Sequence, residues 1–203
     1  FRILILIARS ASSANQSYNT FKPPDPKVLN AMFLISKIIS TIDNVTEYFG
    51  KCLSWAAIVM ALLTGLVVFL RYGLNLGSIF AQEAVTYLHG SLFMLGAIYT
   101  LKSGKHVRVD IFYRKFDVKS QAWVDAIGNI VFLIPFCLFI FFITLDYVAQ
   151  SWSMREASAD PGGIPAVYLL KSLLPMMAIG LILQGLAETL RSVLVILDED
   201  ARK

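Results

Sequence analysis

Four long apolar runs constrain this chain more than any other feature of its sequence. They cover approximately residues 53–70, 84–101, 123–147 and 166–197, and each is long enough for an α-helix to cross a hydrocarbon core of about 30 Å. In lipid, backbone groups must find their hydrogen bonds within the segment, so such runs form helices. With 57% hydrophobic and only 16% charged residues, the chain is too apolar for an ordinary soluble domain. The sequence therefore predicts an all-α membrane protein with four transmembrane helices in one domain, residues 27–197.

Shorter segments accompany the four runs. In residues 27–50 the apolar positions recur at helical spacing, at Val28, Met32, Ile35, Ile39, Ile42 and Phe49. Asp43 and Glu47 lie largely off this stripe, so we predict an amphipathic helix that lies on the inner leaflet or packs against a partner. Residues 111–116 are expected to form a short interfacial segment on the cytoplasmic side. Residues 1–26 are interpreted as a disordered or extraneous lead-in and residues 198–203 as a cytoplasmic tail.

The distribution of basic residues predicts the orientation. Fifteen of the eighteen lysines and arginines lie before the first run, between the second and third runs, or at the C-terminal end, whereas Arg71, Arg155 and Lys171 lie on the other side. Because cationic loops remain in the cytoplasm, both termini are predicted there. Membrane lipids explain the net charge of +4 better than nucleic acid does, because no aromatic residues are interleaved with the cations.

A short motif follows the second apolar run. Gly104 is expected to end the helix, and His106, Arg108 and Asp110 alternate with valines, so they share one side of an extended backbone. We interpret the motif as structural, with Asp110 accepting hydrogen bonds from Arg108 or from backbone N–H groups. The alternative is a solvated run of charges.

Polar residues near or within the runs are candidate contact sites. Arg71 and Glu83 stand near the ends of neighbouring runs, where Glu83 is a functional candidate or the partner of Arg71 in a structural ion pair. Gln184 and Glu188, four residues apart in the fourth run, are expected to pack against a partner.

The segment between the third and fourth runs is rich in turn-forming residues. It carries Arg155, Glu156 and Asp160, which are candidates for docking a soluble partner on the periplasmic side. The alternative interpretation is a loop whose charges only keep it soluble.

Catalytic and ligand-binding signatures are absent from the sequence. It contains no phosphate-binding glycine loop and no His/Cys pattern with metal spacing. Cys52 and Cys137 are interpreted as small apolar residues, and His89 is a single histidine at membrane depth, although a haem-carrying bundle needs histidines on facing helices. We therefore predict neither an enzyme nor a cofactor. An autonomous ion-coupled transporter and a four-span subunit of a redox complex remain alternatives.

Several positions together resemble a known family. They are Arg71-Tyr72, Gln82-Glu83, Leu95-Gly96-Ala97, Tyr99-Thr100-Leu101-Lys102 and, most specifically, the motif from Gly104 to Asp110. This pattern resembles the small membrane subunit of tripartite ATP-independent periplasmic (TRAP) transporters over about residues 28–195. The loop 161–165 and Leu173-Leu174-Pro175 resemble the mannitol or chloroaromatic branch, whose ligands are expected to be 2-oxo or hydroxy acids.

The resemblance implies a role in a three-part uptake system in the bacterial inner membrane. A periplasmic binding protein would deliver an organic acid, and a large membrane subunit would carry it across with sodium. The small subunit would be a scaffold that also shares the docking surface for the binding protein. Sodium coupling is then expected in the large subunit, with no cofactor in this chain.

Overall fold

The computed structural model describes residues 26–104, 113 and 116–201, and its elements are helices. They are α2 (Pro26–Gly73), α3 (Ile79–Lys102), α5 (Val118–Gly128), the π-helix η1 (Asn129–Leu133), α6 (Ile134–Met154) and α7 (Val167–Ala201). The chain divides into two compact units, residues 1–34 and 35–203. Residues 26–34, the described part of the first unit, are helical. All contacts below lie within the second unit.

Four helical stretches of the described chain are long and apolar enough to cross a membrane. They are Met32–Gly73, Ile79–Lys102, Val118–Met154 and Val167–Glu199. The predicted all-α membrane fold with four spans is therefore confirmed. The expected lead-in, residues 1–26, lies outside the described residues except for its last position, as do His106, Arg108 and Asp110 and most of residues 111–116.

The segment 27–50 and the run 53–70 belong to a single helix, α2. Gly50, at the end of the first segment, is the one glycine or proline in residues 27–64. A single glycine costs a helix only about 1 kcal/mol relative to alanine. At this glycine α2 lies very close to α3: a Cβ on Gly50 would lie 2.8 Å from Tyr99 Cε2. The glycine therefore permits close packing of the two helices without interrupting α2.

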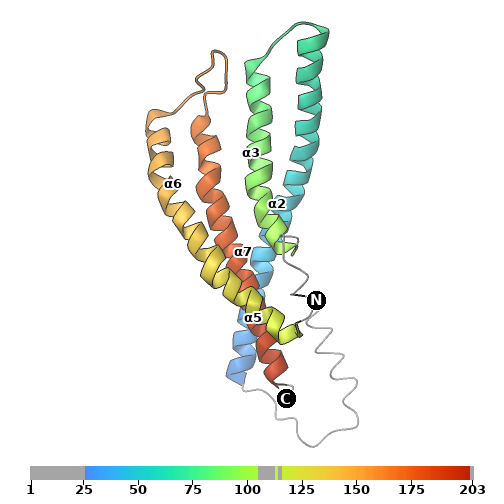
Figure 1. Ribbon diagram of the computed structural model, residues 1–203, viewed down its shortest axis with the longest axis vertical. Helices are drawn as coiled ribbons and strands as arrows, with labels where there is room; N and C mark the ends of the chain where they lie inside the picture. The colour runs from blue at the N-terminus through green and yellow to red at the C-terminus, as the bar shows by residue number, and fades with distance from the viewer. Residues whose placement is uncertain (1–25, 105–112, 114–115, 202–203) are drawn as a thin grey trace, which may run out of the picture. The chain divides into compact units, whose positions relative to one another are not determined.

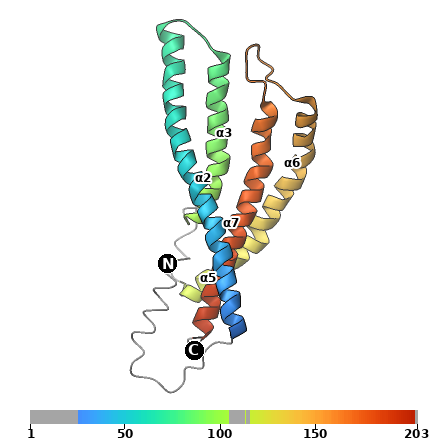
Figure 2. The same cartoon turned by 180° about the vertical axis from the view of Figure 1, so that it is seen from behind.

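Helix α7 is the centre of the bundle. Helices α3, α5 and α6 all pack against it, and Figure 1 shows α7 between α3 and α6. From the opposite side, Figure 2 shows α2 crossing α7. Small side chains dominate the buried positions, as is usual where membrane helices approach closely: Ala122, Ala126, Cys137, Ala178 and Ala187.

The third span contains a local change of helix type. Between α5 and α6, residues Asn129–Leu133 form a π-helical turn immediately before Pro135. A proline has no N–H to donate and its ring crowds the preceding turn, so one wider turn accommodates it without breaking the helix. The third span thus passes Pro135 with a π-helical turn and continues as α6.

Local capping interactions explain where α3 begins and ends. Ser78 caps its N-terminus by accepting a hydrogen bond from Ala81 N at 3.3 Å. At the other end Gly104 has a φ of 64°, the left-handed conformation that lets a chain leave a helix. Tyr113, beyond the motif, donates a hydrogen bond to Asp125 Oδ2 at 2.8 Å and so ties this part of the chain to α5.

Candidate functional site: two polar clusters of the helix bundle

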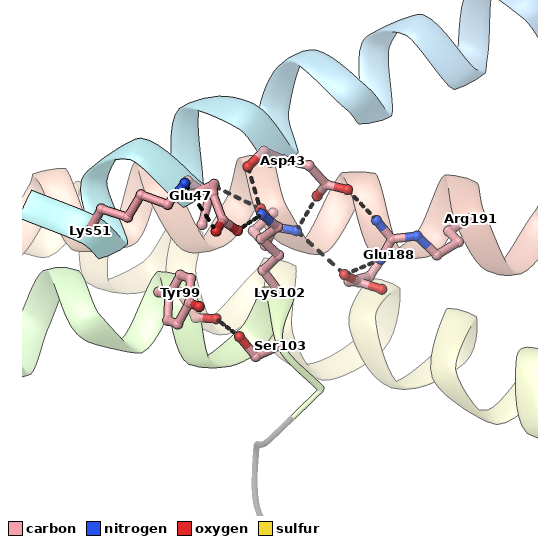
Figure 3. Close-up of polar contacts among 10 residues, drawn as sticks. Asp43, Glu47, Lys51, Tyr99, Lys102, Ser103, Glu188 and Arg191 are labelled. Carbon is pink, nitrogen blue, oxygen red and sulfur yellow. Dashed lines mark hydrogen bonds and ion pairs between the residues drawn. The ribbon is translucent and has the colours of Figure 1, made fainter. Parts of the chain in front are cut away.

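The first cluster joins α2 to α7 and is called here the α2–α7 cluster (Asp43, Thr46, Glu47, Lys102, Gln184, Glu188 and Arg191). At its centre the Arg191 guanidinium donates to Asp43 Oδ2 at 2.6 Å and also to Glu188 on its own helix. Gln184 Nε2 donates to Asp43 Oδ1 at 3.1 Å. Figure 3 shows Asp43 of α2 facing Arg191 and Glu188 of α7.

Lys102 brings a third helix, α3, into the same cluster. Its ammonium group donates to the backbone carbonyl oxygen of Asp43 at 2.9 Å and to Glu47 Oε2 at 2.6 Å. Lys51 approaches the other oxygen of Glu47 at 3.7 Å, which is the pair expected from their spacing of four residues. Lys102 thus links the end of α3, where it lies, to α2, as Figure 3 shows.

Gln184 is the most deeply buried member, with no exposed surface. Its amide oxygen accepts a hydrogen bond from Thr46 Oγ1 at 2.9 Å, and its nitrogen donates to Asp43 and, at 3.4 Å, to Glu188. A buried polar side chain is tolerated when both its donors and its acceptor are used. Gln184 therefore contacts α2 of the same chain, whereas Glu188 bonds Gln184 and Arg191 on its own helix.

This geometry corrects the interpretation of residues 27–50 as an amphipathic helix whose polar residues lie away from the rest of this chain. Asp43 and Glu47 lie off the apolar stripe, but they point at Arg191 and Lys102 of the same chain rather than only at solvent, lipid or another protein. Charge-assisted hydrogen bonds of this kind are among the stronger polar contacts, and removing one partner leaves the other charge poorly solvated.

The second cluster closes the segment between α6 and α7 and is called here the loop cluster (Glu83, Ser151, Glu156, Ser158, Ile164 and Lys171). Glu156 Oε2 accepts from Lys171 Nζ at 2.5 Å and from Ser151 Oγ at 2.6 Å. These two hydrogen bonds, first that of Lys171 and then that of Ser151, hold the pKa of Glu156 below its usual range. The Lys171 ammonium also lies 4.1 Å from the centre of the Tyr147 ring, a cation–π contact.

Glu83 of α3 holds the far side of the same loop. Its carboxylate accepts from the Ser158 hydroxyl and, at 2.6 Å, from the backbone N–H of Ile164. The ion pair expected between Glu83 and Arg71 is therefore wrong. Arg71 is exposed in the last turn of α2 and forms no ion pair among the described residues.

The three docking candidates have different surroundings. Arg155 and Asp160 are exposed, and Arg155 ends α6 in the left-handed conformation with a φ of 45°. Glu156 instead turns toward Lys171 and holds the loop to α7. Only Arg155 and Asp160 are therefore free to meet a partner.

Sequence reasoning missed some of the polar residues that matter most. Lys102 was used only for the orientation and for the family resemblance, and Arg191 only for the orientation, because their partners on α2 lie far away in the chain. Asp146 in α6 was not singled out, although an ionisable residue inside an apolar run is itself a signal.

Metal-ligating side chains do not gather among the described residues. No group of three or more His, Cys, Asp or Glu side chains among them could hold a metal ion. An open groove of about 300 Å³ between α3, α6 and α7 is lined by His89 and Lys171 among mainly apolar residues, and Lys171 is already paired with Glu156. The polar chemistry of these helices is therefore mainly structural.

Comparison with known proteins gives a consistent picture. The model of the DctQ component family of tripartite ATP-independent periplasmic transporters matches residues 60–195. A protein of Haemophilus influenzae, whose assigned name is that of a TRAP transporter small permease protein, is 35% identical over 83 residues. That alignment covers 41% of this chain, and the chain spans about half the length of this curated relative, 51%. No solved structure matches the chain.

The matched region, residues 60–195, is more than half of the chain and contains the loop cluster and the α7 side of the α2–α7 cluster. The chain therefore belongs to the DctQ family, the small membrane component of tripartite ATP-independent periplasmic transporters, and is a transporter component rather than an enzyme.

Proposed function

We propose that this chain is the fixed scaffold of a sodium-coupled TRAP transporter that takes up an organic acid. A large membrane subunit would carry the substrate and sodium, and a periplasmic binding protein would deliver the substrate. The observation that carries the proposal is that Lys102, Gln184 and Arg191 use their hydrogen bonds to join this chain's own helices, through Asp43 and Glu47.

A transport subunit that binds a carboxylate itself needs cations free to receive it. Lys102, Lys171 and Arg191 are instead each paired with a carboxylate of this chain. Pairs that link α2, α3 and α7 resist relative sliding of these helices, because every shift would break charge-assisted hydrogen bonds between them. Such a body suits a frame against which another subunit moves.

Orientation follows from the charge distribution. With fifteen of the eighteen lysines and arginines on one side, both termini lie in the cytoplasm of a bacterial inner membrane and the loop between α6 and α7 faces the periplasm. Arg155 and Asp160 then stand exposed where a binding protein arrives. Exposed charges of this kind orient a partner more than they add affinity.

The substrate class and the ion belong to the partner chains in this proposal. The loop 161–165 supports the mannitol or chloroaromatic branch, which is expected to take 2-oxo or hydroxy acids. A carboxylate substrate and sodium coupling are consistent with the family, and the sites for both would lie in the large subunit.

Reconstitution tests the scaffold directly. Proteoliposomes with the large subunit and the binding protein are compared with and without this chain, under an imposed sodium gradient. We expect uptake only when the chain is present, because a moving domain needs a fixed frame. Full uptake in its absence would refute the scaffold role, and uptake by this chain alone would establish an autonomous transporter.

A second arm of the same assay tests the loop. Arg155→Glu combined with Asp160→Lys should slow uptake and change its dependence on salt while the membrane complex stays intact. Lys37→Glu, which reverses an exposed cation of α2, is the control and should leave uptake unchanged. Equal uptake by the loop variant would remove this loop from the docking surface.

A further inference from the structure

We propose that the face of α6 around Asp146 binds a lysine or arginine side chain carried by a membrane-spanning helix of the large subunit. The identity of this partner rests on the proposed function. The chemistry of the contact, a cation opposite Asp146, rests on the structure of this chain.

Asp146 lies just inside the end of the third apolar run, residues 123–147, and beside Tyr147, which lines a groove together with His89 of α3. Asp146 precedes the last residue of α6, Met154, by eight positions, which is about 12 Å along the helix axis. An aspartate side chain is also too short to reach far along the helix toward water, in contrast to lysine and arginine.

Asp146 differs from the other carboxylates of the described spans, because each of those has a partner in this chain. Asp43 and Glu188 bind Arg191, Glu47 binds Lys102, Glu83 binds Ser158, Asp125 binds Tyr113, and Asp198 and Glu199 also have contacts. Asp146 is exposed and has no hydrogen bond or ion pair with any residue that the structure describes. Among the residues that the structure describes, Asp146 is therefore the one carboxylate of the spans without a partner.

The surroundings of Asp146 form a continuous outward face of α6. The buried side of this helix is marked by Cys137, Val148 and Ser151. The opposite side carries the exposed residues Phe139, Phe142, Ile143, Asp146 and Gln150. Asp146 and Gln150 are four residues apart and lie on the same face of the helix, so this face is apolar at Phe139, Phe142 and Ile143 and polar toward its C-terminal end.

Charge decides which occupant fits this face. Lipid chains would leave the carboxylate without a partner, which is unfavourable. A second copy of the chain, docked through the same face, would bring two carboxylates together. A lysine or arginine on a neighbouring helix satisfies Asp146 with a charge-assisted hydrogen bond and leaves Phe139 and Phe142 to pack against apolar side chains.

The first test measures how well the complex holds together. The tagged chain is co-expressed with the large subunit, and the large subunit retained after detergent extraction is quantified. Asp146→Leu should reduce retention on the order of tenfold or more, because the partner cation is left unpaired. Asp146→Asn, which keeps an acceptor oxygen, should reduce it less, and Lys37→Leu, at an exposed charge of α2, should not change it. Full retention by Asp146→Leu would refute the proposal.

The second test keeps Asp146 intact, so that a folding defect cannot mimic the result. Single cysteines at Ile143 beside Asp146, at Val59 on α2 and at Phe93 on α3 are placed in a Cys-free background. The three side chains are all exposed. A cross-link from Ile143→Cys to the large subunit supports the proposal, and the cross-linked peptide should contain or adjoin a lysine or arginine.

The remaining outcomes separate the two hypotheses. Cross-links to the large subunit only from Val59→Cys or Phe93→Cys would refute the α6 face and leave the scaffold function standing. A cross-link from Ile143→Cys to a second copy would also refute it. Absence of cross-links from all three positions, together with full uptake without this chain, would refute the scaffold function and with it the proposed partner.

Discussion

Gly163 is the residue at which the loop between α6 and α7 depends on the absence of a side chain. A Cβ at this position would lie 2.5 Å from both Glu83 Oε1 and Ser158 Oγ, and 2.6 Å from Ser158 Cβ. The Glu83 carboxylate ends a flexible side chain and could move. Ser158 Cβ is fixed to the backbone, so the loop itself would have to shift and the hydrogen bonds to Glu83 would weaken.

Gly163→Ala is therefore expected to destabilise the protein. Overpacking of this kind typically costs about 1–3 kcal/mol, and we expect the thermal midpoint in detergent to fall by several degrees. Gly77→Ala, in the link between α2 and α3, is the matched control because a Cβ there meets nothing within 4 Å. An unchanged midpoint for Gly163→Ala would mean that the loop is not held by Glu83.

At the level of elements, polar contacts at two separate positions along α7 hold this helix to its neighbours. Lys171 holds the loop that leads into the helix through Glu156, and Arg191 holds α2 through Asp43. Between them the helix buries small residues such as Ala178 and Ala187. Small residues allow close approach of the helices, and the two polar anchors fix their rotation.

The anchor at Glu156 predicts a dependence on pH. Because its pKa in the folded protein lies below the usual value of 4.5, its contribution to stability is complete above that value. The contribution is lost as the pH falls below 4.5 and through the folded pKa, where the carboxylate binds a proton. The thermal midpoint should therefore fall in this acidic range.

Glu156→Gln isolates this effect. The difference in midpoint between the original protein and the variant should be largest at neutral pH and should close below pH 4.5. Asp160→Asn is the control, because Asp160 is exposed and forms no ion pair among the described residues, and its difference should be small at every pH. A difference in thermal midpoint for Glu156→Gln that does not change with pH would show that the charge of Glu156 does not hold the loop.

At the level of the whole molecule, the charge bias predicts which end of the bundle faces the cytoplasm. With Cys52 and Cys137 replaced, Ser103→Cys should react with a membrane-impermeant maleimide in inside-out vesicles, and Ala159→Cys in intact cells after outer-membrane permeabilisation. Ala159 is exposed and its side chain holds no part of the loop. The reverse labelling pattern would invert the orientation and remove Arg155 and Asp160 from the periplasmic side.

The sequence by itself determined the class of fold, the four spans and the family resemblance. Long apolar runs have one solution in lipid, because each backbone N–H and C=O must be satisfied within its own helix. The C-terminal end of α3 could also be predicted, because a glycine such as Gly104 can adopt the left-handed conformation that ends a helix. These are local properties, and local properties can be read along a chain.

Only the tertiary structure decided which polar residues meet. Asp43 binds Arg191, which is 148 residues away, and Glu83 binds the backbone of Ile164, which is 81 residues away. In a soluble helix the apolar stripe reveals which side faces inward, but membrane helices are apolar on nearly every side. Hydropathy therefore does not determine the rotation of these helices or their neighbours. Those two variables decide that Asp43 has a partner and that Asp146 has none among the residues that the structure describes.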